Sequence, residues 1–306
     1  MQIDQASFLK PHFVDVNLRP GDILTVRSAN GQVVEEITAR GPKQAGTFWG
    51  LAAFGDSLRL ELSYARPYQE APFRVDQIII GGTSLLEESA VGAQESICGS
   101  QGDFEDVACY QNDPTKWSNV LASVGVLSVG GDPSSPDPNV GLYCSGVNIS
   151  PDNMILTNQH CVRDQAECNN TEFIFQYRRQ GCNNATATTT WRSYRCDEVV
   201  MASPFERCET DVNGLDFSLQ TVMGNPADTF GFATPDANSI TSGENIYIIQ
   251  HSDGRPQEIN HGGGADFVVD DGGLRYFGTL DTEGGSSGAP IFREADGKLV
   301  GLHHCG

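Results

Sequence analysis

Short apolar segments alternate with turn-forming residues along the first quarter of the chain. Within each segment apolar and polar positions tend to alternate, and Gly, Pro, Asn and Asp separate one segment from the next. Strands of this length with turn signals at this spacing are typical of a small β-sandwich or jelly roll. The segments expected as strands are residues 13–16, 23–26, 33–37, 47–51, 58–62 and 74–80. We therefore expect residues 1–82 to form an accessory β-sandwich without a catalytic cluster.

A second domain is expected at residues 98–306. Residues 83–97, Gly-containing and then acidic, read as a linker before it. In the second domain, residues 117–129 are expected to form the first strand. The run D-P-S-S-P-D-P at 132–138 is typical of a polar surface loop.

Composition narrows the classes of function. The 306 residues carry a formal net charge of −21, from 40 acidic and 19 basic residues. This charge disfavours binding to nucleic acid or to an anionic membrane, both of which need a basic surface. No apolar run approaches the ~20 residues of a membrane-spanning helix, and no signal peptide is recognisable at the N-terminus.

The cysteines indicate an oxidising compartment. There are nine, and none lies in a C-x-x-C pair. Such usage favours disulfides over metal binding and predicts a secreted, extracellular protein. The odd number leaves at least one cysteine without a partner in this chain.

A run of small residues near the end, G-G-S-S-G-A-P at 284–290, can expose a nucleophilic serine. Gly285 and Gly288 allow the tight turn and the close approach of a substrate. The nucleophile would be Ser287, with the N–H groups of Gly285 and Ser287 as oxyanion donors. A flexible Gly/Ser turn without chemistry is the alternative interpretation of this motif alone.

Two further motifs supply the groups that such a serine needs. His160 lies in L-T-N-Q-H-C at 156–161, between Cys144 and Cys161, whose bonding would fix the backbone around the imidazole. Asp216 interrupts an apolar run, where a carboxylate needs a partner such as an imidazole N–H. The chain order His160, Asp216, Ser287 is that of the chymotrypsin-type triad.

Taken together, C-S-G at 144–146, L-T-N-Q-H-C, L-D-F-S-L at 215–219 and G-G-S-S-G-A-P resemble the trypsin-like (chymotrypsin-fold) serine endopeptidases. The chain is most similar to the bacterial lysyl and glutamyl endopeptidase branch, over about residues 95–306. The resemblance implies an all-β fold, in which the β-sandwich is followed by a chymotrypsin-like double β-barrel. That barrel is expected to be truncated at its C-terminus, because the chain stops soon after the strand at 298–304.

The resemblance also implies a set of disulfides. The bond beside the catalytic histidine would join Cys144 to Cys161. Of the others, Cys196 and Cys208 are close enough in sequence to form a disulfide across a hairpin. Cys168 would then be unpaired. The pairs expected from the resemblance to lysyl endopeptidases are Cys98–Cys305 and Cys109–Cys182.

Three residues bear on the side chain that would be accepted before the scissile bond. Asp281 lies six residues before Ser287, at the position that resembles the acidic floor of the trypsin pocket, and favours cleavage after Arg or Lys. Thr282 and His303 instead match residues with which glutamyl endopeptidases receive an acidic side chain. Asp281 as an ordinary turn carboxylate is a third possibility.

The leading hypothesis is a secreted serine endopeptidase that cleaves proteins or peptides after Arg or Lys, without a cofactor or metal; a glutamyl-specific endopeptidase is the alternative within the same class. A catalytically inert secreted binding protein is the alternative from another class. A metal site at His303, His304 and Cys305 is disfavoured, because neighbours on a strand point to opposite faces. No nucleic acid and no membrane span are expected, and a separate C-terminal chain or segment is a conceivable partner.

Overall fold

The computed structural model describes residues 1–4, 6–81, 97, 102–129, 142–184, 186–187, 191–204, 215–238, 240–262 and 279–304. Strands dominate these residues, and the all-β fold class is confirmed. The chain divides into two compact units, Met1–Glu88 and Ser89–Gly306. This division falls in the segment expected as a linker, of which only Ile97 is among the described residues.

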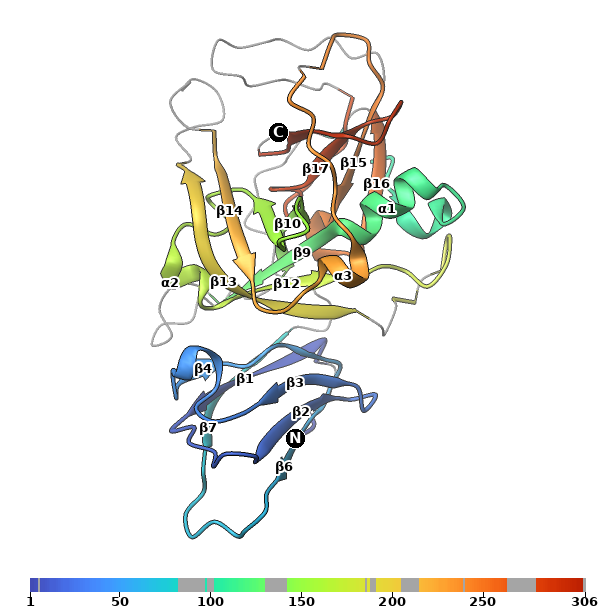
Figure 1. Ribbon diagram of the computed structural model, residues 1–306. Helices are drawn as coiled ribbons and strands as arrows, with labels where there is room; N and C mark the ends of the chain where they lie inside the picture. Colours follow the sequence, from blue (N-terminus) through green and yellow to red (C-terminus); the bar gives the residue numbers. More distant parts are fainter. Residues whose placement is uncertain are drawn as a thin grey trace. The chain divides into compact units, whose positions relative to one another are not determined.

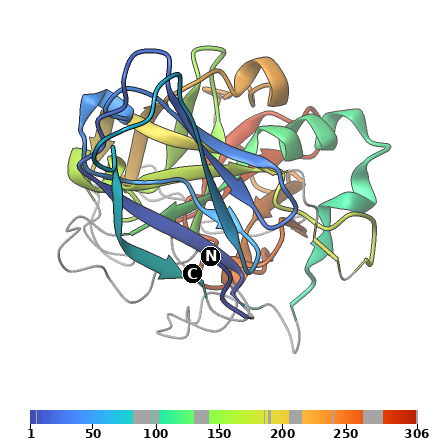
Figure 2. The same ribbon diagram turned by 90° about the horizontal axis from the view of Figure 1, so that it is seen from below.

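The first unit is built from two antiparallel sheets (Figures 1 and 2). In one sheet β1 pairs with β4, β5 and β7, and in the other β2 pairs with β3 and β6. Phe13 and Phe48 from the first sheet pack with Leu24 and Val26 of the second in one buried cluster, so the two sheets form a sandwich. The strands are β1 (Phe8–Val14), β2 (Ile23–Ser28), β3 (Val33–Ile37), β4 (Phe48–Trp49), β5 (Ala53–Phe54), β6 (Leu58–Ser63) and β7 (Arg74–Ile80), with a 3-10 turn η1 at Pro42–Gln44.

The second unit contains a closed six-stranded barrel (Figure 1). Its strands follow the order β10-β11-β14-β13-β12-β9 around the barrel, and all pairs are antiparallel. Val124, Ile155, Phe173 and Phe175 fill its interior. The strands are β9 (Ser123–Ser128), β10 (Leu142–Asn148), β11 (Met154–Thr157), β12 (Thr171–Phe175), β13 (Arg192–Ser203) and β14 (Phe217–Val222).

A five-stranded sheet of order β18-β17-β15-β16-β8 packs beside this barrel. Val147 of β10 shares a buried cluster with Tyr247 and Ile249 of β15 and with Phe292 of β17, which joins barrel and sheet into one core. Residues 263–278, which the expected second barrel would include, lie outside the described part. The strands are β8 (Glu105–Asp106), β15 (Ile246–Gln250), β16 (Glu258–Gly262), β17 (Pro290–Arg293) and β18 (Leu299–Leu302), and two 3-10 turns accompany them, η2 (Val107–Tyr110) and η3 (Ser252–Gly254).

Helix α1 (Pro114–Ala122) corrects the expectation of a strand from residue 117. The Asp113 carboxylate accepts hydrogen bonds from the N–H groups of Thr115 and Lys116, and Pro114 occupies the first turn, so the helix is capped at its start. Strand β9 begins only at Ser123. The other helices are the four-residue α2 (Gln165–Cys168) and α3 (Ala227–Phe230), and no helix among the described residues has the length and apolar character to span a bilayer.

Three disulfides lie among the described residues, Cys109–Cys182, Cys144–Cys161 and Cys168–Cys196. The suggested Cys196–Cys208 pairing is therefore wrong. Helix α2 lies against β13, where the Gln165 side chain donates to the Asp197 carbonyl, and this contact places Cys168 beside Cys196. The expected Cys98–Cys305 bond and Cys208 lie outside the described residues.

Peptide mapping checks this correction. A digest of the unreduced protein should contain a linked peptide pair that joins Cys168 to Cys196, and reduction should separate it. A linked pair that joins Cys196 to Cys208 instead would contradict the position of α2 against β13.

Candidate active site

The buried carboxylate of Asp216 pairs with the partly exposed imidazole of His160. Asp216 Oδ2 lies 2.6 Å from His160 Nδ1, and Asp216 Oδ1 accepts a hydrogen bond of 3.0 Å from the His160 backbone N–H. Asp216 is 0% exposed. Two contacts with the same residue fix both the position and the orientation of the ring, and they leave Nε2 to face away from the carboxylate.

Asp216 is aimed at His160 by its backbone. It directly precedes β14 and has a φ of 45°, in the left-handed region that Asp tolerates better than most residues. The Asn158 side chain donates to the Asp216 carbonyl at 2.7 Å, which ties this turn to the segment that carries His160. This turn therefore places the buried Asp216 carboxylate against the segment that carries His160.

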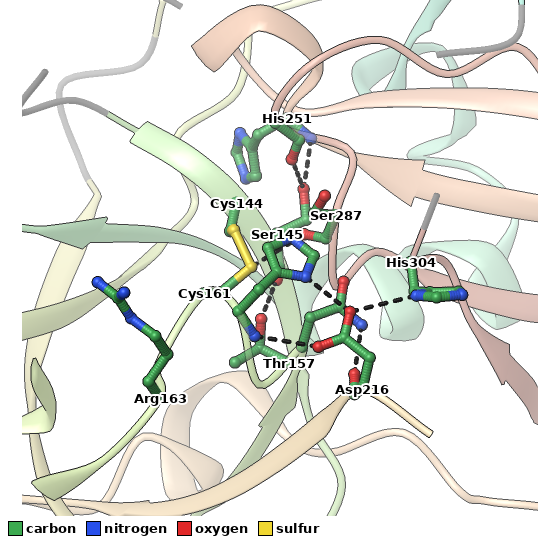
Figure 3. The surroundings of a disulfide bond; sticks show 12 residues. Cys144, Ser145, Thr157, Cys161, Arg163, Asp216, His251, Ser287 and His304 are labelled. Carbon is green, nitrogen blue, oxygen red and sulfur yellow. Dashed lines mark hydrogen bonds and ion pairs between the residues drawn. A yellow bond between two sulfur atoms is a disulfide. The ribbon is translucent and has the colours of Figure 1, made fainter. Parts of the chain in front are cut away.

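A second imidazole contacts the same carboxylate. His304 Nδ1 lies 3.2 Å from Asp216 Oδ2, the oxygen that also faces His160, and Figure 3 shows His304 beside Asp216. Burial acts to raise the pKa of the Asp216 carboxyl, but the hydrogen bonds from His160 and His304 outweigh it and hold the pKa below its ordinary value. Asp216 is therefore a carboxylate at neutral pH.

Ser287 belongs to the nucleophile loop, by which we mean residues 283–288. The Ser145 N–H donates to the Ser287 carbonyl at 2.7 Å, and the Ser287 carbonyl also lies 3.9 Å from Cys161 Sγ, next to His160 in the chain (Figure 3). A Cβ added to Gly288 would lie 2.2 Å from the Ser145 carbonyl oxygen, so only glycine permits this close approach. The loop that bears Ser287 is thus pressed against the segment that bears His160.

Its neighbour Ser286 is differently placed. Ser286 is 0% exposed, and its hydroxyl accepts from the Glu283 N–H and lies 3.3 Å from the Ser252 hydroxyl. Ser287 retains 8% exposure. The buried hydroxyl of Ser286 therefore supports the loop from within, and Ser287 is the serine with access to solvent.

Peptide orientation leaves two N–H groups of the loop available. The carbonyl of Gly284 accepts from the Asp253 N–H, and that of Ser286 accepts from the Ala289 N–H. Because C=O and N–H point in opposite directions across a trans peptide, the N–H groups of Gly285 and Ser287 point away from these anchors. Neither N–H makes a backbone hydrogen bond within the described residues, whereas those of Ser286 and Gly288 donate to Glu283 and His303.

The three candidate specificity residues all lie near this loop. Asp281 is 2% exposed, and its carboxylate accepts the Asp103 N–H at 2.6 Å. Thr282 is 2% exposed, and its hydroxyl has no hydrogen-bond partner among the described residues. His303 pairs through its backbone with Gly288 and Ala289, which places it directly beside the loop.

The site offers no thiolates for a metal. The ligand atoms of Cys144, His160 and Cys161 lie within 4.8 Å of one another, but the two sulfurs are bonded to each other. Metal binding by cysteine requires the thiolate form. This group of three residues therefore serves to fix His160 and does not form a metal centre.

The region that contains His160, Asp216 and Ser287 matches a known protein family. The sequence profile of the trypsin-like peptidase domain matches residues 144–302, just over half of the 306 residues. The chain belongs to this family. The matched range begins at the cysteine beside Ser145 and includes His160, Asp216 and Ser287, so the trypsin-like domain contains the whole candidate site.

Similar proteins extend the comparison. A relative from Plasmopara viticola, named secreted RxLR effector protein 73, is 27% identical over 98% of this chain and 75% of its own length. A glutamyl endopeptidase in complex with MPD has a TM-score of 0.46 and 23% identity, over 69% of this chain and 88% of that one. The MamO protease domain from Magnetospirillum magneticum has a TM-score of 0.40 and 17% identity, over 61% and 85%.

Two residues of the trypsin-like site were not predicted from the sequence. His304 was considered only as an unfavourable metal ligand, and Ser145 only as part of the C-S-G motif. Their partners, Asp216 and Gly285, are 88 and 140 residues distant in sequence. The sequence contains Ser145 in C-S-G and two successive histidines at 303–304, but neither pattern indicates which distant residue the side chain contacts.

The contact between His304 and Asp216 predicts a change in pH dependence. A carboxyl group with a depressed pKa in the folded state contributes stability that is present above its unfolded pKa of about 3.9 and lost as pH falls through the folded pKa. Replacing His304 by Ala removes one donor, so the folded pKa of Asp216 should rise toward the ordinary value. We expect H304A to lower the free energy of unfolding by about 1 kcal/mol at pH 6.

Urea denaturation between pH 6 and pH 2.5 measures this effect. The difference between H304A and wild type should shrink as pH falls below the unfolded pKa of about 3.9 and toward the lower folded pKa of Asp216. H304N is the matched control, because the Asn side-chain amide replaces the Nδ1 donor. A difference that stays constant over the whole range would show that Asp216 is not the group concerned.

Proposed function

We propose that the protein is a secreted serine endopeptidase with Ser287 as nucleophile, His160 as general base and Asp216 as the residue that orients His160. The observation that carries the proposal is the pair of His160 with the buried Asp216 carboxylate, which lies in a trypsin-like domain against the loop that bears Ser287. With Nδ1 held by Asp216, the ring has Nε2 as its one site for proton exchange.

The reaction would proceed in two balanced stages. Ser287 Oγ attacks the scissile carbonyl carbon while His160 Nε2 takes the hydroxyl proton, and the protonated imidazole then gives this proton to the leaving amine. Water repeats the sequence on the acyl-enzyme, with His160 again as the base, and releases the acid product and free Ser287. Asp216 stays ionised throughout and stabilises the imidazolium that forms twice per turnover.

The N–H groups of Gly285 and Ser287 would stabilise the oxyanion. Both belong to peptides whose carbonyls are anchored elsewhere, on Asp253 and Ala289, so the donors are oriented before substrate binds. Donors that are fixed in advance need no reorganisation as negative charge develops, and each contributes on the order of 3 kcal/mol to transition-state stabilisation.

For the residue before the scissile bond, the contacts favour glutamate over the basic side chains that Asp281 suggests. The Asp281 carboxylate already accepts a main-chain N–H and is buried. The Thr282 hydroxyl, by contrast, is a buried donor without a described partner, and His303 lies beside the loop. A substrate carboxylate would satisfy the Thr282 hydroxyl, whereas a guanidinium, which has only donors, would leave its hydrogen unpaired.

Secretion is part of the proposal. The three disulfides favour an oxidising compartment, and the Plasmopara viticola relative is itself named a secreted effector. An inert binding protein with a protease-like domain is the alternative, but the presence of His160, Asp216 and Ser287, the first two in contact, supports an enzyme. Covalent labelling separates these two functions.

A fluorophosphonate probe should label the protein at Ser287. S287A should abolish labelling, because Ser287 is the proposed nucleophile and the neighbouring Ser286 is fully buried. S286A should still be labelled at Ser287, though more slowly, since the loop loses one internal hydrogen bond. Mass spectrometry of the labelled peptide locates the adduct, and a wild-type protein that takes up no probe would favour the inert alternative.

Cleavage of a peptide library tests the substrate preference. We expect cuts after Glu, and T282V should lower kcat/KM for these substrates roughly 10- to 100-fold, the effect of losing a hydrogen bond to a charged group. Valine matches threonine in shape, so the change isolates the hydroxyl. D281N serves as the comparison: cuts after Arg or Lys that D281N suppresses would contradict the acidic preference and support the basic one.

A further inference from the structure

The buried Ser145 hydroxyl connects two parts of the second unit. Ser145 lies on β10 and is 1% exposed. Its Oγ accepts a hydrogen bond of 2.9 Å from the His251 backbone N–H and donates one of 2.9 Å to the Gly285 carbonyl. His251 directly follows β15 and precedes η3, so this one hydroxyl joins the barrel, the five-stranded sheet and the nucleophile loop (Figure 3).

Ser145 holds the nucleophile loop at two points. Its N–H donates to the Ser287 carbonyl and its hydroxyl to the Gly285 carbonyl, so the carbonyls on both sides of Ser286 are anchored on a single residue. The Ser145 carbonyl is occupied as well, by the Thr157 hydroxyl at 2.7 Å. Every polar atom of Ser145 is therefore paired. Its N–H and its hydroxyl bind the carbonyls of Ser287 and Gly285, the two residues whose N–H groups are the proposed oxyanion donors.

The loop needs this support because its glycines permit other peptide orientations. Gly285 has a φ of 94°, a conformation that glycine adopts readily along with several alternatives. Its carbonyl is held by the Ser145 hydroxyl, and the carbonyl of Gly284 is held by the Asp253 N–H, in the same turn as His251. Without the Ser145 hydroxyl, the Gly285 carbonyl and the His251 N–H would both be buried and unpaired, which favours rearrangement of the loop.

We propose that Ser145 is a positioning residue. Its hydroxyl ties the Gly285–Ser286 peptide, which lies between the two peptides that bear the oxyanion donors, to the His251 turn and so keeps both donors in place. This inference rests on the proposed function. In this role, the neutral Ser145 hydroxyl links the His251 N–H to the Gly285 carbonyl and so keeps the nucleophile loop in its active form. Such a residue touches no substrate, and its loss should act on the transition state more than on substrate binding.

Steady-state kinetics on the full chain tests this role, after fluorophosphonate labelling of the wild type has shown that Ser287 reacts. The substrate is a fluorogenic peptide that carries the preferred residue found in the library, and the inhibitor is a peptidyl boronic acid of the same sequence. S145A should lower kcat roughly tenfold or more, up to the 10²–10³-fold that follows loss of an oxyanion donor. KM should change little, and the boronate should bind more weakly by a similar factor.

Three further variants separate positioning from general destabilisation. S123A is the matched control, because Ser123 is also 1% exposed and donates to a carbonyl, that of Asn119, away from the loop. S123A should lower Tm as S145A does and leave kcat within about twofold of wild type. S145T retains the hydroxyl and S145V has the same shape without it, so activity in S145T and its loss in S145V supports the relay even if S145A does not fold.

Equal kcat in S145A and S123A at equal Tm would overturn the inference, and so would equal activity in S145T and S145V. Neither result would contradict the proposed triad, because Ser287 would still be labelled in the wild type. Failure of wild-type labelling is a different outcome, which overturns the proposed function and the role of Ser145 with it.

Discussion

Burying the carboxylate of Asp216 without donors would disfavour the fold, because a charge removed from water must be paired and hydrogen-bonded. The structure supplies the His160 N–H, the His160 ring and the His304 ring to its two oxygens. These contacts come from the segment after β11 and from the residues after β18, so satisfying one carboxylate brings barrel and sheet together. The same contacts select the orientation of His160 that the proposed catalysis by Ser287 requires.

A second constraint acts on the main chain of the nucleophile loop. Four successive carbonyls, from Gly284 to Ser287, accept hydrogen bonds from Asp253, Ser145, Ala289 and again Ser145. Because the carbonyls are held, the directions of the N–H groups are also determined. The side chains of the loop thus contribute less to its shape than the backbone partners around it, and the small residues of G-G-S-S-G are what allow those partners to approach.

Local patterns predicted much of the fold. The alternation in residues 23–26 and 58–62 identified β2 and β6, and the motifs around His160, Asp216 and Ser287, in that chain order, identified the candidate triad. The helix at Pro114–Ala122 was missed although Asp113-Pro114 is a local start signal. The Cys168–Cys196 bond, the His304–Asp216 contact and the Ser145 relay depend on tertiary packing between distant segments, which no local pattern specifies. Asp281 shows the same limit, since its main-chain partner Asp103 is 178 residues away.

In the proposed enzyme, Ser287 and the N–H groups of Gly285 and Ser287 form one preorganised catalytic unit with His160 and Asp216. A crystal structure with a bound peptidyl boronic acid would show whether this unit exists. We expect a bond from boron to Ser287 Oγ, with one boronate oxygen about 2.7–3.1 Å from both N–H groups and the loop carbonyls on their present partners. Boron bound to another residue, or a Gly284 carbonyl turned toward the boronate, would contradict it.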